Sequence, residues 1–112
     1  MGDADQHTCP GELQATLGQF KRRLQDALGE RIRVILFGSF ARGENEPDSD
    51  VDVLVVVPRC DGETIDLVLE TAWEVGFEAG LILSVIPVGE DELPRLSDSP
   101  FIRAVRQEGI AI

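Results

Sequence analysis

The sequence lacks the apolar run of roughly 20 residues that a membrane-spanning helix requires, although 43% of its 112 residues are hydrophobic. Its first residues are polar and acidic, unlike a signal or transit peptide, so we expect a cytoplasmic protein with no membrane partner. Cysteine is scarce, and Cys9 and Cys60 lack the paired spacing of a zinc site. Repeats and low-complexity stretches are also absent. We therefore expect one domain over residues 10–112, preceded by a flexible tail over residues 1–9.

Positive charge is also scarce, since 10 lysines and arginines stand against 21 aspartates and glutamates, for a net charge of −11. Lys21 is the single lysine, and the other basic residues are arginines. A chain with this charge repels polyanions, which disfavours binding to bulk DNA or RNA. A phosphate-bearing substrate would need local neutralisation by metal ions or by a few arginines. Partner proteins should present basic surfaces.

The hydrophobic pattern predicts alternating helices and strands. Leucine and phenylalanine recur at helical spacing over residues 11–28, and short β-branched runs bounded by glycine, proline or charge indicate strands. The expected fold is a mixed α/β (α+β) sandwich, in which a small mixed β-sheet is covered by helices. The helices are expected over 11–28, 64–76 and 101–107, the strands over 31–37, 50–57 and 81–88, and a terminal tail or edge strand over 110–112.

Two aspartates stand at the beginning of the second predicted strand, which is otherwise almost wholly apolar. Side chains alternate between the faces of a strand, so Asp50 and Asp52 point the same way, roughly 6–7 Å apart. Like charges at the edge of a core are unfavourable unless they are compensated, and Mg²⁺ or Mn²⁺ bound by carboxylate oxygens would compensate them. Taken alone, the Asp-x-Asp pattern is more often a solvent-exposed strand start.

A candidate phosphate-binding segment precedes the two aspartates. Gly38 and Ser39 come directly after the first predicted strand and before a short helical turn, where backbone N–H groups and a hydroxyl can hold phosphate oxygens. Ten residues separate Ser39 from Asp50, and Arg42 lies between them. Arg42 either faces a phosphate or pairs with an acid such as Asp48.

These segments resemble a known family. Leu-Phe-Gly-Ser-Phe-Ala-Arg-Gly at 36–43 and Ser-Asp-Val-Asp-Val-Leu-Val at 49–55 are similar to the signature of the polymerase-β-like nucleotidyltransferase superfamily, above all to its minimal nucleotidyltransferases. The signature is Gly-Ser, ten residues and Asp-x-Asp, and every position of it is filled. The resemblance predicts the corresponding fold over the single domain.

The resemblance also implies a reaction and its residues. Gly38 and Ser39 would hold the triphosphate of ATP or another nucleotide, and Asp50 and Asp52 would be catalytic ligands of two Mg²⁺ ions, with Mn²⁺ as a substitute. A nucleoside monophosphate, expected to be AMP, would pass to a hydroxyl. Minimal nucleotidyltransferases are commonly paired with HEPN-domain proteins as antitoxin and toxin. A hydroxyl on such a partner is the expected acceptor, and homo-oligomerisation is left open.

One family feature is missing from the sequence. Active members usually carry a third carboxylate on the next strand, whereas the strand over 81–88 has Ser84 as its one polar side chain. Glu78 precedes that strand and Glu90 follows it, and either acid would have to reach inward. The alternative hypothesis is therefore a catalytically weakened binding module that neutralises or senses a partner by contact.

The helix over 64–76 carries the remaining residues of interest. Trp73 shares a helical face with Leu69 and is expected in the core or in a partner-facing patch. Glu70, Glu74 and Glu78 recur every four residues, which is typical of a solvated acidic face and also suits a basic partner.

Overall fold

The computed structural model describes residues 11–43 and 50–112. Its sheet has four strands in the order β3-β2-β1-β4. β1 (Arg33–Phe37) runs antiparallel to β2 (Val51–Val57) on one side and to β4 (Ile110–Ala111) on the other. β3 (Leu83–Gly89) pairs in parallel with the outer side of β2 and forms an edge of the sheet. The predicted mixed sheet is confirmed, and the chain end after Gly109 forms an edge strand.

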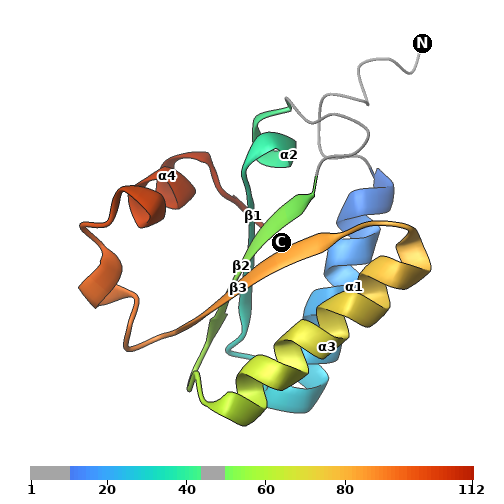
Figure 1. Cartoon of the computed structure of the whole chain (residues 1–112), viewed down its shortest axis with the longest axis horizontal. Coiled ribbons are helices and arrows are strands. Elements are labelled where there is room, and N and C mark those ends of the chain that lie inside the picture. The colour runs from blue at the N-terminus through green and yellow to red at the C-terminus, as the bar shows by residue number, and fades with distance from the viewer. Residues whose placement is uncertain (1–10, 44–49) are drawn as a thin grey trace.

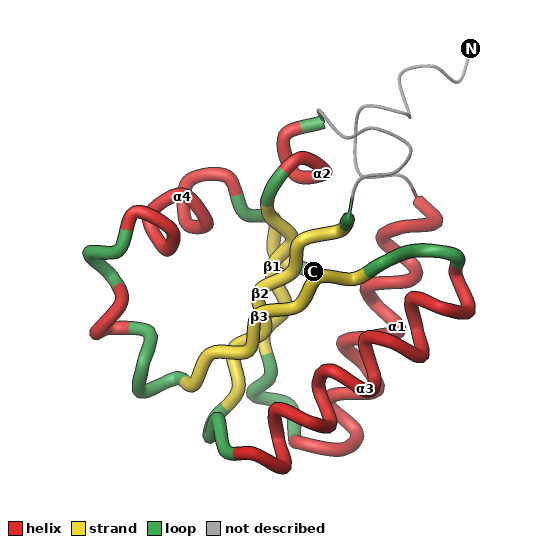
Figure 2. Tube along the Cα trace, viewed as in Figure 1, coloured by secondary structure: helices red, strands yellow, loops and turns green. Residues whose placement is uncertain are grey.

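Helices cover both faces of the sheet, as the ribbon and tube views show (Figures 1 and 2). α1 (Gly11–Leu28) and α3 (Gly62–Ala79) pack side by side on one face. α4 (Pro100–Glu108) lies on the other face, together with the short 3₁₀ helix η2 (Pro94–Leu96). The single turn α2 (Ser39–Arg42) follows β1 directly. No helix among the described residues is long and apolar enough to cross a membrane.

The alternation of β2 divides the core into two clusters. Val51, Val53, Val55 and Val57 are buried against α1 and α3, whereas Leu54 and Val56 are buried against α4. Side chains at even positions of β2 therefore face α4, and Asp52 belongs to that set.

Local signals fix the helix ends. The Asp61 carboxylate accepts a hydrogen bond from the N–H of Thr64 at 2.9 Å, so α3 begins at Gly62, two residues before the predicted start. Gly80 adopts a left-handed conformation with φ of 71° and ends α3, three residues beyond the predicted end. Ser99 caps α4, with Pro100 in its first turn.

The structure decides between the two locations expected for Trp73, the core and a partner-facing patch. Trp73 is 69% exposed and Leu69, on the same helical face, is 46% exposed, so the core location was wrong. Val68, Ala72 and Val75 are the buried positions, because the inner face of α3 is rotated away from Trp73. The exposed position leaves the partner-facing alternative for Trp73. The predicted tail over residues 1–9 lies outside the described residues.

Candidate active site

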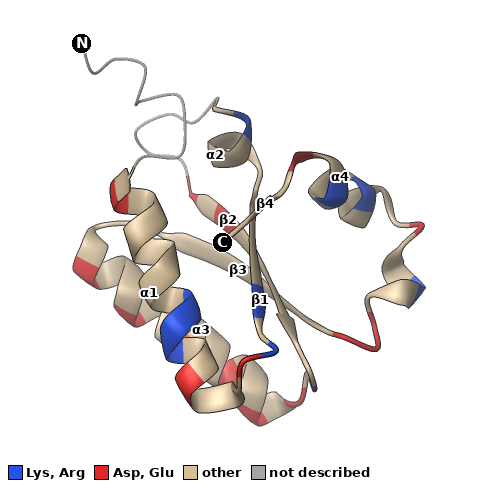
Figure 3. Cartoon of the chain, turned by 180° about the vertical axis from the view of Figure 1, so that it is seen from behind, with Lys and Arg blue, Asp and Glu red and all other residues tan. Residues whose placement is uncertain are grey.

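The fold brings the end of β1 next to the beginning of β2. Because these strands are antiparallel, Phe37, the last residue of β1, is the register partner of Asp52. Gly38 and Ser39 follow Phe37 immediately, and Asp50 directly precedes β2. Asp50 and Asp52 are two positions apart along an extended chain, so both side chains lie on the α4 side of the sheet. Figure 3 shows the acidic start of β2 close to α2.

Gly38 packs directly against the carboxylate of Asp52. A Cβ atom added to Gly38 would lie 2.3 Å from Asp52 Oδ2, which is far inside van der Waals contact. The backbone of Gly38, with φ of 79° and ψ of −154°, lies in a region that is essentially restricted to glycine. Glycine is thus required both for the turn into α2 and for the close approach of the backbone to Asp52.

The environment of Asp52 raises the pKa of its carboxyl group. Burial is the largest cause, the negative charge of Asp50 adds to it, and the nearby positive charge of Arg42 opposes it. The two aspartates and Arg42 therefore lie close enough to interact electrostatically. A cation placed beside Asp50 and Asp52 would relieve their repulsion.

Arg42 connects α2 to α4. Its backbone N–H donates to the Gly38 carbonyl oxygen at 3.1 Å, which closes the turn of α2. Its Nη1 atom donates to Glu108 Oε2 at 3.1 Å. Asp48 lies outside the described residues, so that pairing stays a prediction. Sequence reasoning missed Glu108, because no local pattern indicates a contact between residues so far apart in the chain.

An aromatic pair borders the site on the α4 side. The rings of Phe37 and Phe101 meet edge to face, with centroids 5.3 Å apart. Phe37 is the cross-strand partner of Asp52, and Phe101 is 39% exposed. The pair anchors the start of α4 next to the end of β1. Sequence analysis did not single out either ring for the site.

The position for a third carboxylate is occupied by Ser84, the register partner of Asp52 on β3. Glu78 lies on α3, across the sheet from α4, and Glu90 forms an ion pair with Arg31 beyond the far end of β3. Within residues 11–43 and 50–112, no group of three or more histidine, cysteine, aspartate or glutamate side chains could hold a metal ion.

The donor set nevertheless fits a magnesium ion that is shared with a substrate. Mg²⁺ is often bound by one or two carboxylates, with the remaining positions filled by water and phosphate oxygens. Asp50 and Asp52 supply the carboxylates on one face, and the absence of a Cβ atom at Gly38 lets the Asp52 carboxylate pack directly against the turn that follows β1. The arrangement suits a metal–nucleotide complex better than a metal ion held by protein alone.

Comparisons with known proteins identify the family of this chain. The Nucleotidyltransferase domain family matches residues 17–107. A bifunctional uridylyltransferase/uridylyl-removing enzyme of Novosphingobium aromaticivorans is 32% identical over 99 residues, which cover 83% of this chain and 10% of that enzyme. Two proteins of Methanocaldococcus jannaschii are provisionally assigned as protein adenylyltransferases. One is 29% identical over 98 residues, covering 86% of this chain and 93% of the relative. The other is 45% identical over 47 residues, covering 41% and 48%.

Proposed function

This chain belongs to the nucleotidyltransferase domain family, and we propose that it is a magnesium-dependent enzyme that transfers AMP from ATP to a hydroxyl group. The observation that carries the proposal is the contact between Gly38 and the Asp52 carboxylate, with Asp50 on the same face. Two carboxylates thus lie next to the turn that begins with Gly38 and Ser39, which supports the binding of a metal ion and a triphosphate at this end of the sheet. The resemblance to minimal nucleotidyltransferases and the archaeal relatives favour protein as the acceptor.

Each residue of the site has a separate task in this proposal. Asp50 and Asp52 would hold the divalent ions, whose positive charge would polarise the α-phosphate and neutralise the departing pyrophosphate. Gly38 admits the phosphates next to Asp52, and the Ser39 hydroxyl donates a hydrogen bond to a phosphate oxygen. The Arg42 guanidinium adds positive charge at the same end of the sheet. The acceptor oxygen bonds to the α-phosphorus as pyrophosphate leaves and the hydroxyl proton is released.

We further propose that the acceptor is a HEPN-domain protein, to which this chain would be the antitoxin. The support is the resemblance of residues 36–43 and 49–55 to minimal nucleotidyltransferases, which are commonly paired with such proteins. The net charge of −11 is compatible with a basic partner that acts on RNA. Homo-oligomerisation stays a separate, untested expectation.

A second candidate function rests on Ser84. Because Ser84 occupies the strand position beside Asp52, a third carboxylate is missing from the described residues where active members of the superfamily carry one. A hydroxyl is a weak ligand for Mg²⁺ compared with a carboxylate. The alternative is therefore a domain that binds a nucleotide or a partner without transferring AMP.

Labelled ATP separates the two functions. The purified chain is incubated with Mg²⁺ and a HEPN-domain protein encoded by an adjacent gene, using ATP labelled either in the α-phosphate or in the γ-phosphate. If the chain is an enzyme, the label of the α-phosphate is transferred to the partner and the label of the γ-phosphate is not. Asp50→Asn and Asp52→Asn should both abolish this transfer. Asp98→Asn, an exposed aspartate near α4, serves as the matched control. Neutralisation of the partner without label, unchanged in both variants, would establish the binding module.

A further inference from the structure

A second surface with a distinct chemistry lies along α3 and the start of the edge strand β3. A groove of about 490 Å³ is lined by apolar residues of α3, of the loop that follows it and of the first position of β3: Leu69, Ala72, Trp73, Phe77, Leu81, Ile82 and Leu83. Trp73, Phe77 and Ile82 are between 65% and 69% exposed. Large side chains are rarely this accessible in a contiguous patch unless they bind another molecule. We call this surface the α3–β3 groove.

The aromatic residues of the groove form an ordered ridge. Trp73 and Phe77 are one helical turn apart, and their ring centroids lie 5.2 Å from one another. Leu69 precedes Trp73 by one further turn, so the ridge extends over about 12 Å of the helix axis. This length matches two turns of a partner helix with apolar residues at positions i, i+4 and i+7.

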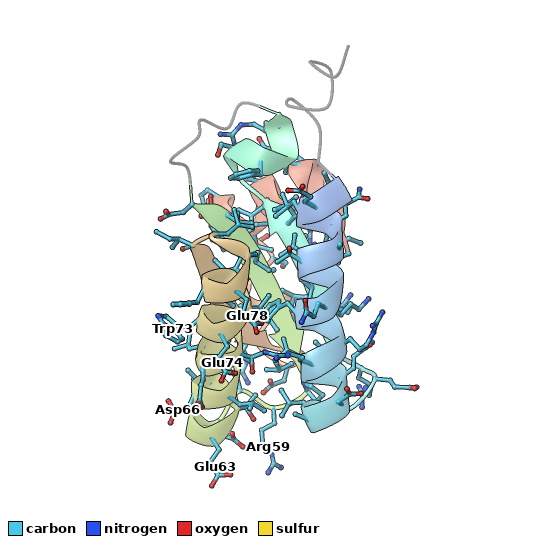
Figure 4. The ribbon with its side chains drawn as sticks, turned by 90° about the vertical axis from the view of Figure 1, so that its right-hand side faces the viewer. Arg59, Glu63, Asp66, Trp73, Glu74 and Glu78 are labelled. Atoms are coloured by element: carbon cyan, nitrogen blue, oxygen red, sulfur yellow. The ribbon has the colours of Figure 1, made fainter. Side chains whose placement is uncertain are left out.

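Acidic residues of α3 lie beside the aromatic ridge, on the side of the ridge that is opposite the groove. In Figure 4 Trp73 projects away from α1, whereas Glu74 and Glu78 lie on the side facing α1. Arg23 of α1 pairs with Glu74 at 3.7 Å. In the described part of the chain, the other acids of this flank have no ion pair: Glu63, Glu70 and Glu78. An apolar groove with an acidic flank is complementary to an apolar stripe flanked by lysine or arginine.

The edge of β3 offers little to an added strand. Val51 N–H bonds to the Ile82 carbonyl and Glu90 N–H to the Val57 carbonyl, so the even positions of β3 face β2. The outward positions include Pro87, which has no N–H group. The N–H of Gly89 already donates to Glu92 at 3.0 Å. Leu83 and Val85 alone remain as outward donors within the strand, too few for stable pairing.

We propose that the α3–β3 groove binds an amphipathic helix of a partner protein, with an apolar stripe in the groove and lysine or arginine beside the acidic flank. A second copy of this chain fits poorly, because it would bring the same acidic flank and a net charge of −11. Binding of a partner helix in this groove is a function separate from AMP transfer, and the proposal does not depend on that transfer. The Ile82 end of the groove lies next to the aspartates, since the Ile82 carbonyl accepts from Val51 N–H at 2.9 Å.

Two synthetic peptides test the groove on the full chain. Both have about 16 residues, or about 24 Å of helix, and the same leucine stripe without tryptophan, but one is flanked by lysine and the other by glutamate. Trp73 is the single tryptophan, so a blue shift of its emission reports burial in the groove. The lysine peptide is expected to bind at least about tenfold more tightly than the glutamate peptide, and more weakly as salt increases.

Surface variants locate the binding. Phe77→Ser and the double variant Glu70→Lys/Glu78→Lys should each weaken binding of the labelled lysine peptide at least about tenfold. Leu96→Ser and Asp98→Lys, exposed changes beside α4, are the matched controls and should leave it unchanged. Circular dichroism confirms that each variant is folded. Equal binding of both peptides, no binding, or equal loss in the controls would overturn the proposal. Dimers of the unmodified chain that Phe77→Ser dissociates would also overturn it.

Discussion

The Asp52 carboxylate lies against the Cα atom of Gly38, so that a side chain at Gly38 would collide with Asp52 Oδ2 at 2.3 Å. This contact joins the segment expected to hold phosphate to the strand expected to hold metal. It explains why the signature needs glycine at this position. The residue must adopt a backbone conformation that other residues avoid, and it must leave the carboxylate in place.

Gly38→Ala should therefore impair both stability and the site. The strained backbone and the contact with Asp52 are expected to lower the free energy of unfolding by about 1–3 kcal/mol. Binding of Mg²⁺-ATP should weaken more than this loss of folded protein explains. Urea denaturation and calorimetric titration measure the two effects. Gly18→Ala is the control, because nothing lies within 4 Å of that position in α1 and alanine favours a helix. Equal behaviour of the two variants would contradict the account.

Ser84→Asp tests the missing carboxylate. The side chain at this position lies beside Asp52 on the same face of the sheet, since the two residues are register partners. The Ser84→Asp variant should bind Mn²⁺ at least about tenfold more tightly than the unmodified chain and should transfer AMP faster. Ile86→Asp, two register pairs further along the same strand and on the same face, is the control and should change neither the Mn²⁺ affinity nor the transfer rate. Unchanged metal affinity in Ser84→Asp would show that Ser84 does not occupy the proposed ligand position.

The Arg42–Glu108 ion pair distinguishes a phosphate ligand from a structural link. Both side chains are about 40% exposed, so loss of the pair should cost at most about 1 kcal/mol of stability. Arg42→Ala is expected to weaken ATP binding about tenfold, whereas Glu108→Gln should leave it unchanged or tighten it. Calorimetric titration with Mg²⁺-ATP measures both. Equal weakening in the two variants would indicate that Arg42 acts only by holding α2 to α4.

The Asp61 cap gives the protein a predictable acid dependence. The N–H of Thr64 stabilises the carboxylate and lowers the pKa of Asp61. A lowered pKa in the folded state means that the cap stabilises α3 above the unfolded-state pKa and is lost as pH falls through the folded-state pKa. Asp61→Ala should lower the melting temperature by roughly 2–6 °C at pH 7 and by less at pH 3. Asp61→Asn retains an acceptor for the Thr64 N–H, so its melting temperature should fall by less than that of Asp61→Ala. An equal loss at both pH values would contradict this account.

The sequence predicted the strands well, and the structure brings the two segments of the candidate site next to one another. β1 and β2 are short, β-branched and bounded by glycine or charge, and the Gly38–Ser39 and Asp50–Asp52 spacing is local to the turn between them. Side-chain alternation was enough to place both aspartates on one face. Local signals therefore contained most of the proposed site.

Features that depend on tertiary packing could not be predicted. The ion pair of Arg42 with Glu108 and the contact of Phe37 with Phe101 require α4 to return to the site across the sheet. The exposure of Leu69 and Trp73 could not be decided from the sequence, because two adjacent stripes of α3 are apolar and only packing determines which one faces the sheet. The exposed stripe that contains Trp73 lines the α3–β3 groove.

Binding of ATP tests the central claim most directly, because the site must hold a nucleotide whether or not it transfers AMP rapidly. Calorimetry with an ATP analogue that cannot be cleaved between the α- and β-phosphates should show binding that requires Mg²⁺. Asp50→Asn and Asp52→Asn should each weaken it at least about tenfold, while Asp98→Asn should not. Binding of equal strength in all four proteins, or binding that is indifferent to Mg²⁺, would contradict the assignment of Asp50 and Asp52 as the metal-binding pair.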